Sequence, residues 1–282
     1  MNKGYRWAMG LLLAIVIGVV SFLFFFQGGE NLLWSREKVQ QTLITSDSDT
    51  QTVDEQENRI TIGFSVKKRP IEAIVIGSGE DVTLILAGVH GDEPEGTYVA
   101  EMLIKYLLSE ENNRFERKKI IIIPQVNPDG LVSKIRGNAN KVDINRNFPT
   151  RDWNPNARNK RYNLGQHPGS EPETQAIIRA LQEFKPNKVI SIHSPCYQIN
   201  FDGPAVELAM EMASYNSYSV RPYIGYPTQG SLGTYAGKER AIPTITLELA
   251  RVPKELAWFQ NKEALIAAIY FSSKTHIGKP RT

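Results

Sequence analysis

The sequence has a single cysteine, little net charge and no internal repeat. Because Cys196 has no second cysteine to pair with, it cannot form an intramolecular disulfide, and cysteine usage does not distinguish compartments. The formal net charge is +3, and basic residues are spread along the chain rather than gathered in a stripe, which argues against nucleic acid as a partner. A hydrophobic content of 41% in 282 residues is enough for about one domain with a full core.

One long apolar run stands at the N-terminus, from Trp7 to Phe26, and contains no charged residue. Its 20 residues would span roughly 30 Å as a helix, the thickness of a bilayer's hydrocarbon core. We therefore predict a transmembrane helix at residues 7–26. A cleaved signal peptide is the alternative, but the run is longer than a usual signal-peptide core and lacks a small-x-small cleavage pattern at its end.

The charges around this run predict its orientation. Lys3 and Arg6 precede it, whereas the first basic residue after it is Arg36, so residues 1–6 are expected in the cytoplasm. Residues 27–58 are polar and aperiodic, which is typical of a flexible linker. We expect a membrane-anchored protein whose catalytic domain, residues 59–282, lies on the extracytoplasmic, periplasmic side.

Short apolar runs alternate with helical patterns from residue 59 onward. The strand-like runs are 71–77, 82–88, 118–124, 188–193 and 244–250, and the helical patterns are 95–108, 171–184, 205–218 and a segment from 254. This order predicts an α/β fold with a mixed, largely parallel sheet and helices on both faces. In such sheets ligands bind beyond the carboxyl ends of the strands. Residues 150–169, rich in Asn, Pro, Gly and Arg, are expected to form a long loop near that edge.

Two of these strand patterns end in residue types that commonly bind zinc. The sequence LILAGVHGDEPE at 84–95 leaves a strand through a glycine turn that presents His90 and Glu93, and His193 closes the run KVISIH. Catalytic zinc is typically held by three such ligands, with one position open for water. His90, Glu93 and His193 are therefore the predicted ligands of one zinc ion per chain.

Three other candidate ligands are set aside. His167 and His276 lie outside these motifs and are interpreted as structural residues. Cys196 follows His193 by three residues, but a fourth protein ligand would fill the open position and make a closed structural site. We interpret Cys196 as a small packed thiol.

Seven short motifs together resemble the zinc carboxypeptidases of the funnelin type, over roughly residues 71–250. They are HGDE at 90–93, NPDG at 127–130, RGNANKVDINRNFP at 136–149, GSEPET at 169–174, SIHSP at 191–195, GSLGTYAG at 230–237 and TLEL at 246–249. Their order and spacing are more specific than any one motif. The resemblance implies a metallocarboxypeptidase or amidase with the zinc ligands named above.

The resemblance also implies two carboxylates with defined roles. Glu248 matches the general base that takes a proton from the zinc-activated water and passes it to the leaving amine. Asp143 matches the carboxylate that orients His90. For Glu248 the alternative is a solvent-facing residue of the strand at 244–250, whose apolar residues alternate with it and would face inward.

Polar residues of the 136–149 motif match the substrate-binding groups of the family. Arg136 matches the arginine that stabilises the oxyanion, and Asn145 and Arg146 match the pair that binds the terminal carboxylate of the substrate. A surface arginine is the alternative for Arg136. Tyr226 is either a phenol that caps the substrate or a packed loop residue.

The family resemblance implies hydrolysis of murein peptides at the bond between γ-D-glutamate and meso-diaminopimelate, or of another peptide with a free terminal carboxylate. One alternative is an N-acyl amino acid deacylase resembling the succinylglutamate desuccinylases, against which the NPDG and DINRNFP motifs argue. Another is an anchored, catalytically inactive module that binds cell-wall peptides. A binding module would not need Glu248, so its presence beside all three ligands favours an enzyme.

Overall fold

The computed structural model describes residues 58–109, 115, 117–157 and 162–272. The predicted membrane segment 7–26, and all but the last residue of the predicted linker, lie outside these residues, as does His276. Among the residues that are described, no helix has the length and apolar character needed to cross a bilayer.

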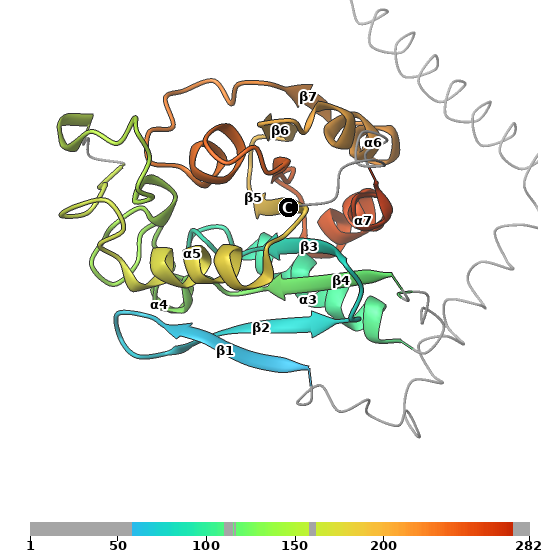
Figure 1. Ribbon diagram of the computed structural model, residues 1–282, viewed down its shortest axis with the longest axis horizontal. Helices are drawn as coiled ribbons and strands as arrows, with labels where there is room; N and C mark the ends of the chain where they lie inside the picture. The colour runs from blue at the N-terminus through green and yellow to red at the C-terminus, as the bar shows by residue number, and fades with distance from the viewer. Residues whose placement is uncertain (1–57, 110–114, 116, 158–161, 273–282) are drawn as a thin grey trace, which may run out of the picture. The chain divides into compact units, whose positions relative to one another are not determined.

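A mixed sheet of eight strands occupies the centre of the described domain (Figure 1). Its spatial order is β1-β2-β4-β3-β5-β8-β6-β7. The strands are β1 (Arg59–Phe64), β2 (Pro70–Ile76), β3 (Asp81–Leu86), β4 (Lys118–Ile123), β5 (Lys188–His193), β6 (Gln198–Asp202), β7 (Ser219–Arg221) and β8 (Thr244–Glu248). The central strands β4, β3, β5 and β8 are parallel, and the direction reverses at β2 and at β6. The predicted mixed, largely parallel sheet is confirmed.

Helices cover both faces of this sheet, and α5 and α3 are seen on opposite sides of it in Figure 1. The α-helices are α3 (Pro94–Leu108), α4 (Pro128–Ser133), α5 (Pro172–Phe184), α6 (Val206–Asn216) and α7 (Lys254–Tyr270). Short turns of other helix types are η2 (Ile144–Arg146), η3 (Pro155–Ala157) and the π-helix η4 (Gly233–Lys238). Helices α3, α6 and α7 share one buried cluster with the sheet, and α5 and η4 share the other.

Alternation along each strand divides its side chains between these two clusters. In β4, Ile120 and Ile122 pack with α3 and α7, whereas Ile121 and Ile123 pack with α5. A central strand is therefore apolar at consecutive positions, because both of its faces are covered. The same alternation sends Leu247 of β8 into the α3 cluster and turns its neighbours to the opposite face.

The five apolar runs and the four helical patterns of the sequence correspond to strands and helices of the structure. Strands β1, β6 and β7 were not predicted. Both edge strands, β1 and β7, are partly exposed, so neither shows a continuous apolar run. Helix α4 was also missed, because Asn127 and Pro128 resemble a turn; here Asn127 caps the helix by accepting from the Gly130 amide at 2.9 Å.

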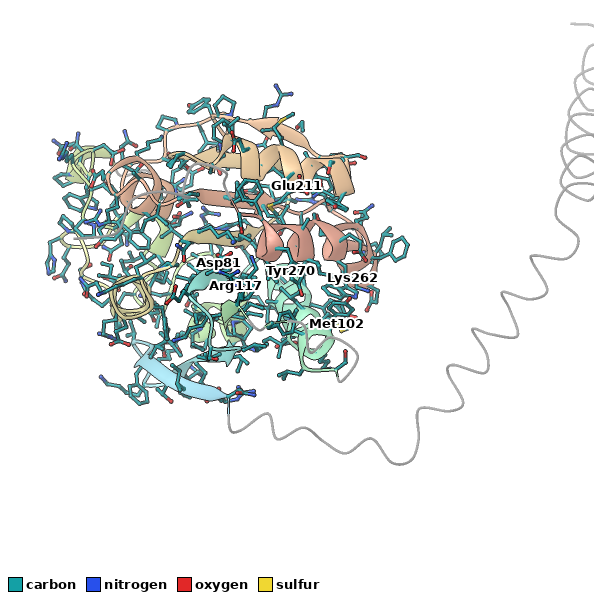
Figure 2. All side chains as sticks on the ribbon, turned by 45° about the vertical axis from the view of Figure 1, so that its right-hand side comes forward. Asp81, Met102, Arg117, Glu211, Lys262 and Tyr270 are labelled. Carbon is teal, nitrogen blue, oxygen red and sulfur yellow. The ribbon has the colours of Figure 1, made fainter. Side chains whose placement is uncertain are left out.

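A partly buried ion-pair cluster connects the end of α7 to the starts of the central strands. Lys118 and Lys188 bind the two carboxylate oxygens of Asp81 at 2.5 and 2.9 Å. The same ammonium groups donate to the carbonyls of Tyr270 and Phe271 at 3.2 and 2.7 Å, where cations are favourable at a helix C-terminus. Asp81 and Tyr270 are seen together in Figure 2. Burial lowers the pKa of Lys188, and the hydrogen bond and charge of Asp81 oppose this shift.

We predict that Asp81→Asn lowers the free energy of unfolding by about 1–3 kcal/mol, because it leaves the nearly buried Lys188 without its carboxylate. Burial acts to raise the pKa of Asp81, but the two lysines outweigh it and hold that pKa below 3.8. The stabilisation is therefore present at neutral pH and is lost as the pH falls through the lowered pKa. Urea denaturation at pH 7 and pH 3 measures both effects.

Glu80→Gln, at the exposed neighbouring position, is the control and is expected to change stability by less than about 0.5 kcal/mol. Equal stability of the Asp81 variant and the wild type at pH 7 would contradict the role of this cluster.

Candidate metal centre and substrate cavity

The carboxyl ends of β3 and β5 bring the predicted zinc ligands together. His90 follows β3 through a tight turn, Glu93 directly precedes α3, and His193 is the last residue of β5. The turn is held by close contact with the NPDG motif: a Cβ on Gly91 would lie 1.9 Å from the carbonyl carbon of Gly130. Only a glycine allows the two motifs to pack so closely.

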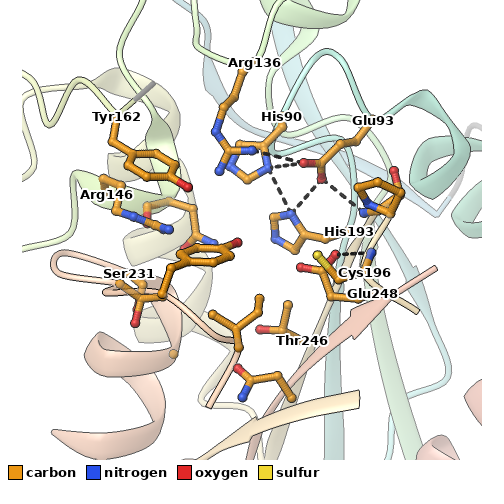
Figure 3. Close-up of a pocket in the computed structure, with 18 of the residues that line it drawn as sticks. His90, Glu93, Arg136, Arg146, Tyr162, His193, Cys196, Ser231, Thr246 and Glu248 are labelled. Atoms are coloured by element: carbon orange, nitrogen blue, oxygen red, sulfur yellow. Dashed lines mark hydrogen bonds and ion pairs between the residues drawn. The ribbon is translucent and has the colours of Figure 1, made fainter. Parts of the chain in front are cut away.

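The three side chains converge on a single point and are buried (Figure 3). The Nδ1 atoms of His90 and His193 lie 3.1 Å apart, and the Glu93 oxygens lie 2.8 and 2.9 Å from them. Tetrahedral zinc with bonds of about 2.0–2.1 Å places neighbouring ligand atoms about 3.3 Å apart. Two imidazole nitrogens and a carboxylate at these distances fit a zinc ion with only a slight outward adjustment.

Outer contacts hold the two imidazoles in place. His90 Nε2 lies 3.1 Å from Asp143 Oδ1, and His193 Nε2 lies 3.0 Å from Ser191 Oγ. Such contacts fix the ring orientation and the tautomer of metal-binding histidines. Asp143 thus contacts His90 as predicted. Ser191 was missed, although its position two residues before His193, on the same face of β5, is a signal that the sequence contains.

The charges of this group favour a bound cation. Burial acts to lower the pKa of His90, but the charge of Glu93, with help from Asp143, outweighs it and raises that pKa to about 9. Burial acts to raise the pKa of Glu93, but His90 and His193 hold it well below its ordinary value. The carboxylates therefore create a site of negative potential in which a positive charge is stabilised.

Glu248 lies beside the metal ligands because β8 pairs with β5. The register of the two parallel strands places Glu248 opposite His193. Its side chain lines the cavity, its Oε2 accepts from the Cys196 amide at 3.3 Å, and the residue is only 4% exposed. The alternative of a solvent-facing Glu248 is therefore wrong, although the alternating Leu247 does face the core as that alternative assumed.

The ligands and Glu248 form one wall of a cavity of about 200 Å³. Arg136, Asn145, Arg146 and Tyr226 also line it, so every predicted site residue except Asp143 lines this one cavity. Arg136 is not a surface arginine: its Nε donates to Asp143 at 2.9 Å and its Nη1 to Glu93 at 3.2 Å. Burial acts to lower the pKa of Arg136, but these carboxylates raise it, so the guanidinium stays charged.

Arg146 is a buried cation that lies against two aromatic rings and donates from Nη1 to the Asn145 carbonyl at 2.5 Å. It is 3% exposed, and its guanidinium carbon lies 4.9 Å from the Tyr162 ring centre and 5.8 Å from that of Tyr226. Its Nε has no hydrogen-bond partner among the described residues. Beside it, Asn145 Oδ1 accepts from the Leu232 amide at 2.9 Å, which fixes the side-chain amide. A buried guanidinium whose Nε has no partner among the described residues is suited to a carboxylate ligand.

The two tyrosines form an aromatic pair at the cavity, with ring centres 6.0 Å apart and an interplanar angle of 17°. Burial and the charge of Glu248 raise the pKa of Tyr226 to about 12, so it is a neutral phenol. Tyr226 lines the cavity, where either of its two interpretations places it beside Arg146. Tyr162 was not predicted, because it stands alone in a polar loop with no pattern around it.

Two other sequence interpretations can be compared with the structure. His167 is exposed and contacts the carbonyl of Pro168, away from the metal ligands. We expected Cys196 to be a packed thiol, and this prediction is wrong. Cys196 is exposed and lines the cavity. The reason is its place in the connection after β5, where its backbone amide is used to bind Glu248.

Comparison with known proteins agrees with this geometry. The zinc carboxypeptidase family model matches residues 50–203. Murein peptide amidase A of Escherichia coli K12 is 34% identical over 163 residues, which cover 54% of this chain and 64% of that protein. The match therefore spans less than two thirds of that relative's length. Murein peptide amidase A of Vibrio campbellii is 31% identical over 198 residues, covering 66% of this chain and 76% of that protein.

Solved structures show the same fold. The crystal structure of murein-tripeptide amidase from Escherichia coli O157 superposes with a TM-score of 0.66 at 28% identity, covering 77% of this chain and 93% of that one. Carboxypeptidase A from Helicoverpa armigera has a TM-score of 0.65 at 19% identity, covering 74% and 67%.

We predict that the purified protein binds one equivalent of zinc, measured by metal analysis after reconstitution. His193→Ala should remove most of it, because two protein ligands remain, and Ser191→Ala should weaken zinc binding about 10- to 100-fold. His167→Ala is the control and should retain the full equivalent. Less than half an equivalent in the folded wild type, or full retention in His193→Ala, would show that the site is assigned wrongly.

Proposed function

Because the chain belongs to the zinc carboxypeptidase family, we propose that it is a zinc-dependent hydrolase of murein peptides. The bond cleaved is that between γ-D-glutamate and meso-diaminopimelate, and free diaminopimelate is released. The names of its murein peptide amidase relatives support the substrate class. The observation that carries the proposal is one cavity that holds a zinc-binding triad, a buried carboxylate and a buried arginine.

Arg146 and Asn145 bind the terminal carboxylate of the substrate in this proposal. The guanidinium of Arg146 is buried, lies against two aromatic rings and has an unused donor. A planar guanidinium gives a carboxylate two parallel hydrogen bonds. Because Arg146 is buried, a carboxylate that takes up its unused donor is stabilised by charge as well as by hydrogen bonding. This favours substrates with a free carboxylate next to the scissile bond.

Glu248 and Arg136 act on the reacting atoms. When bound, a zinc ion supplies a Lewis acid and lowers the pKa of a coordinated water to about 7. Glu248 accepts a proton from the attacking water and delivers it to the leaving amine. Arg136 uses its Nε and Nη1 to bind Asp143 and Glu93, and since a guanidinium has five N–H donors, others remain for the oxyanion.

The two alternative functions, an N-acyl amino acid deacylase and a catalytically inactive binding module, require different features of the cavity. An N-acyl amino acid deacylase needs the same metal chemistry but a different acyl pocket. A binding module needs no base, yet Glu248 is buried next to the metal ligands, a position that costs stability without a function. The burial of Glu248 therefore favours an enzyme.

We predict free diaminopimelate as the product when the zinc-loaded protein is incubated with L-Ala-γ-D-Glu-meso-diaminopimelate. Mass spectrometry measures it, with N-acyl amino acids tested in parallel. The physical reason is that Arg146 and Asn145 require a carboxylate next to the scissile bond. Preferred cleavage of N-acyl amino acids would establish the deacylase alternative, and a zinc-loaded protein that hydrolyses nothing would favour the binding module.

The N-terminal segment places this activity at a membrane in our proposal. Residues 7–26 anchor the chain, and residues 27–58 link it to the catalytic domain. That domain lies outside the cytoplasm, on the side of the membrane where murein is found. The support is the uncharged run preceded by Lys3 and Arg6.

We predict that, after residue 58, a reporter that functions only outside the cytoplasm is active and a reporter that functions only in the cytoplasm is inactive. Fusions of the same reporters after residue 6, without the apolar run, are the control. An active cytoplasmic reporter after residue 58, or a soluble protein beginning near residue 27, would contradict the anchor.

A further inference from the structure

Tyr162 lies against both arginines of the cavity. The guanidinium carbon of Arg146 is 4.9 Å from the centre of its ring, and that of Arg136 is 5.4 Å away. A guanidinium within about 6 Å of an aromatic ring centre is attracted to the electron-rich face of the ring. Tyr162 and Arg146 are seen beside each other in Figure 3. One ring therefore contacts the two cations to which the proposed function gives separate roles.

The two arginines depend on this ring to different degrees. Arg136 donates to the carboxylates of Asp143 and Glu93 at 2.9 and 3.2 Å, and these ion pairs hold it without help from an aromatic ring. Arg146 is 3% exposed, its Nη1 donates to the Asn145 carbonyl, and its Nε has no partner among the described residues. Hydrogen bonds between two charged groups are stronger than those to a neutral carbonyl. Arg146 is therefore the arginine whose orientation depends more on the ring.

Tyr162 is the nearer of two rings beside Arg146. The ring centre of Tyr226 is 5.8 Å from the guanidinium carbon, and the two ring centres are 6.0 Å apart with an interplanar angle of 17°. These distances form a triangle with sides of similar length, so the guanidinium lies beside the pair of rings and not between them. Because the attraction weakens with distance, Tyr162 contributes more of it, and Tyr226 packs against Tyr162.

The chain next to Tyr162 is bound to the segment that carries the arginines. The Asn163 carbonyl accepts from the Asp143 amide at 2.8 Å, and the Leu164 carbonyl accepts from Asn147 Nδ2 at 2.8 Å. Both donors belong to the same sequence motif as the two arginines. The position of the ring is therefore set by the same support as the guanidinium groups.

We propose that Tyr162 is a positioning residue that directs the guanidinium of Arg146 toward the terminal carboxylate of the substrate. This inference rests on the proposed function, in which Arg146 binds that carboxylate. An aromatic face attracts a guanidinium without accepting hydrogen bonds from the N–H groups in its plane. A carboxylate in the place of Tyr162 would take those donors and compete with the substrate. Tyr162 thus holds Arg146 in the cavity and leaves its donors for the ligand.

The test compares Tyr162→Leu, which removes the ring, with Tyr162→Phe, which keeps it. The constants kcat and KM are measured for the zinc-loaded variants with L-Ala-γ-D-Glu-meso-diaminopimelate. Tyr162→Leu should raise KM about three- to thirtyfold, the range of a partly to fully desolvated cation–π contact, and change kcat less than about threefold, because Arg136 keeps its carboxylates. Tyr162→Phe should stay within about twofold of the wild type. The control Tyr215→Leu, at a position on α6 that is 54% exposed, should leave both constants unchanged.

A second substrate shows whether Tyr162 acts through Arg146. The same tripeptide, with the carboxylate next to the scissile bond converted to a carboxamide, offers the guanidinium no charged partner, so the wild type should cleave it slowly. Tyr162→Leu should lower kcat/KM for this peptide less than about twofold. In an Arg146→Leu background, Tyr162→Leu should likewise have little further effect on the original peptide, because the contact that it removes is already gone.

The proposal would be overturned by an unchanged KM in folded Tyr162→Leu, or by an equal rise of KM in Tyr162→Leu and Tyr162→Phe. It would also be overturned if Tyr162→Leu weakened cleavage of the carboxamide peptide as much as that of the carboxylate peptide, or kept its full effect in the Arg146→Leu background. Zinc content and thermal unfolding establish that each variant is folded. If Tyr162→Leu does not fold, Tyr162→Gln replaces it, because a polar side chain suits this partly exposed loop position.

A binding measurement separates the role of Tyr162 from the proposed function. If the zinc-loaded wild type cleaves neither peptide, the proposed function fails, and an NMR titration with propionate tests Tyr162 alone. The Nε–H resonance of Arg146, assigned by its loss in Arg146→Leu, should shift as propionate binds, and uncharged propionamide should not shift it. About three- to thirtyfold more propionate should be needed in Tyr162→Leu than in Tyr162→Phe or the wild type. Equal propionate affinity in the three proteins, or no shift in the wild type, would overturn the proposal.

Discussion

The register of three parallel strands is the constraint on which this site depends. Strands β3, β5 and β8 end at the same edge of the sheet, and pairing of β5 with β8 sets His193 directly opposite Glu248. The turn after β3 adds His90 and Glu93. Because side chains alternate along a strand, a slip of one residue in β8 would turn Glu248 into the core. Register therefore decides whether the predicted metal ligands and Glu248 meet.

The charged side chains at this edge of the sheet are kept in position by contacts with residues of a neighbouring loop. Asp143 and Arg136 contact His90 and Glu93, and both belong to the motif at 136–149. That loop is fastened by the GSEPET motif, because Asn138 donates to Glu171 and Glu173 at 2.7 and 2.8 Å.

Asn147 continues the same attachment. Its Oδ1 accepts from the Glu171 amide at 3.0 Å, and its Nδ2 donates to Ser170 Oγ at 3.1 Å. Motifs that are far apart in sequence thus form one support for Arg136 and Arg146, which line the cavity. Their shared task explains why the spacing of the motifs is as informative as the metal ligands themselves.

Much of this arrangement can be read from the sequence, since buried strands are continuous apolar runs and metal ligands stand at their ends. Glu248 is conspicuous because a carboxylate interrupts such a run, and its predicted role came from the family resemblance. Tyr162 and Ser191 were missed, because each is a common polar or aromatic residue whose contacts with the site come from tertiary neighbours. Cys196 was interpreted wrongly for a related reason: its exposure depends on the path of the chain after β5, which no local pattern encodes.

The central claim is that Glu248 acts on water beside a metal that other residues hold. Glu248→Gln keeps the size of the side chain and removes its basicity, and it leaves His90, Glu93 and His193 in place. Turnover and zinc content of this one variant, measured together with substrate affinity, test the claim most directly. The account predicts full zinc retention and substrate binding with turnover reduced roughly 10²- to 10⁴-fold. Turnover near that of the wild type would contradict it.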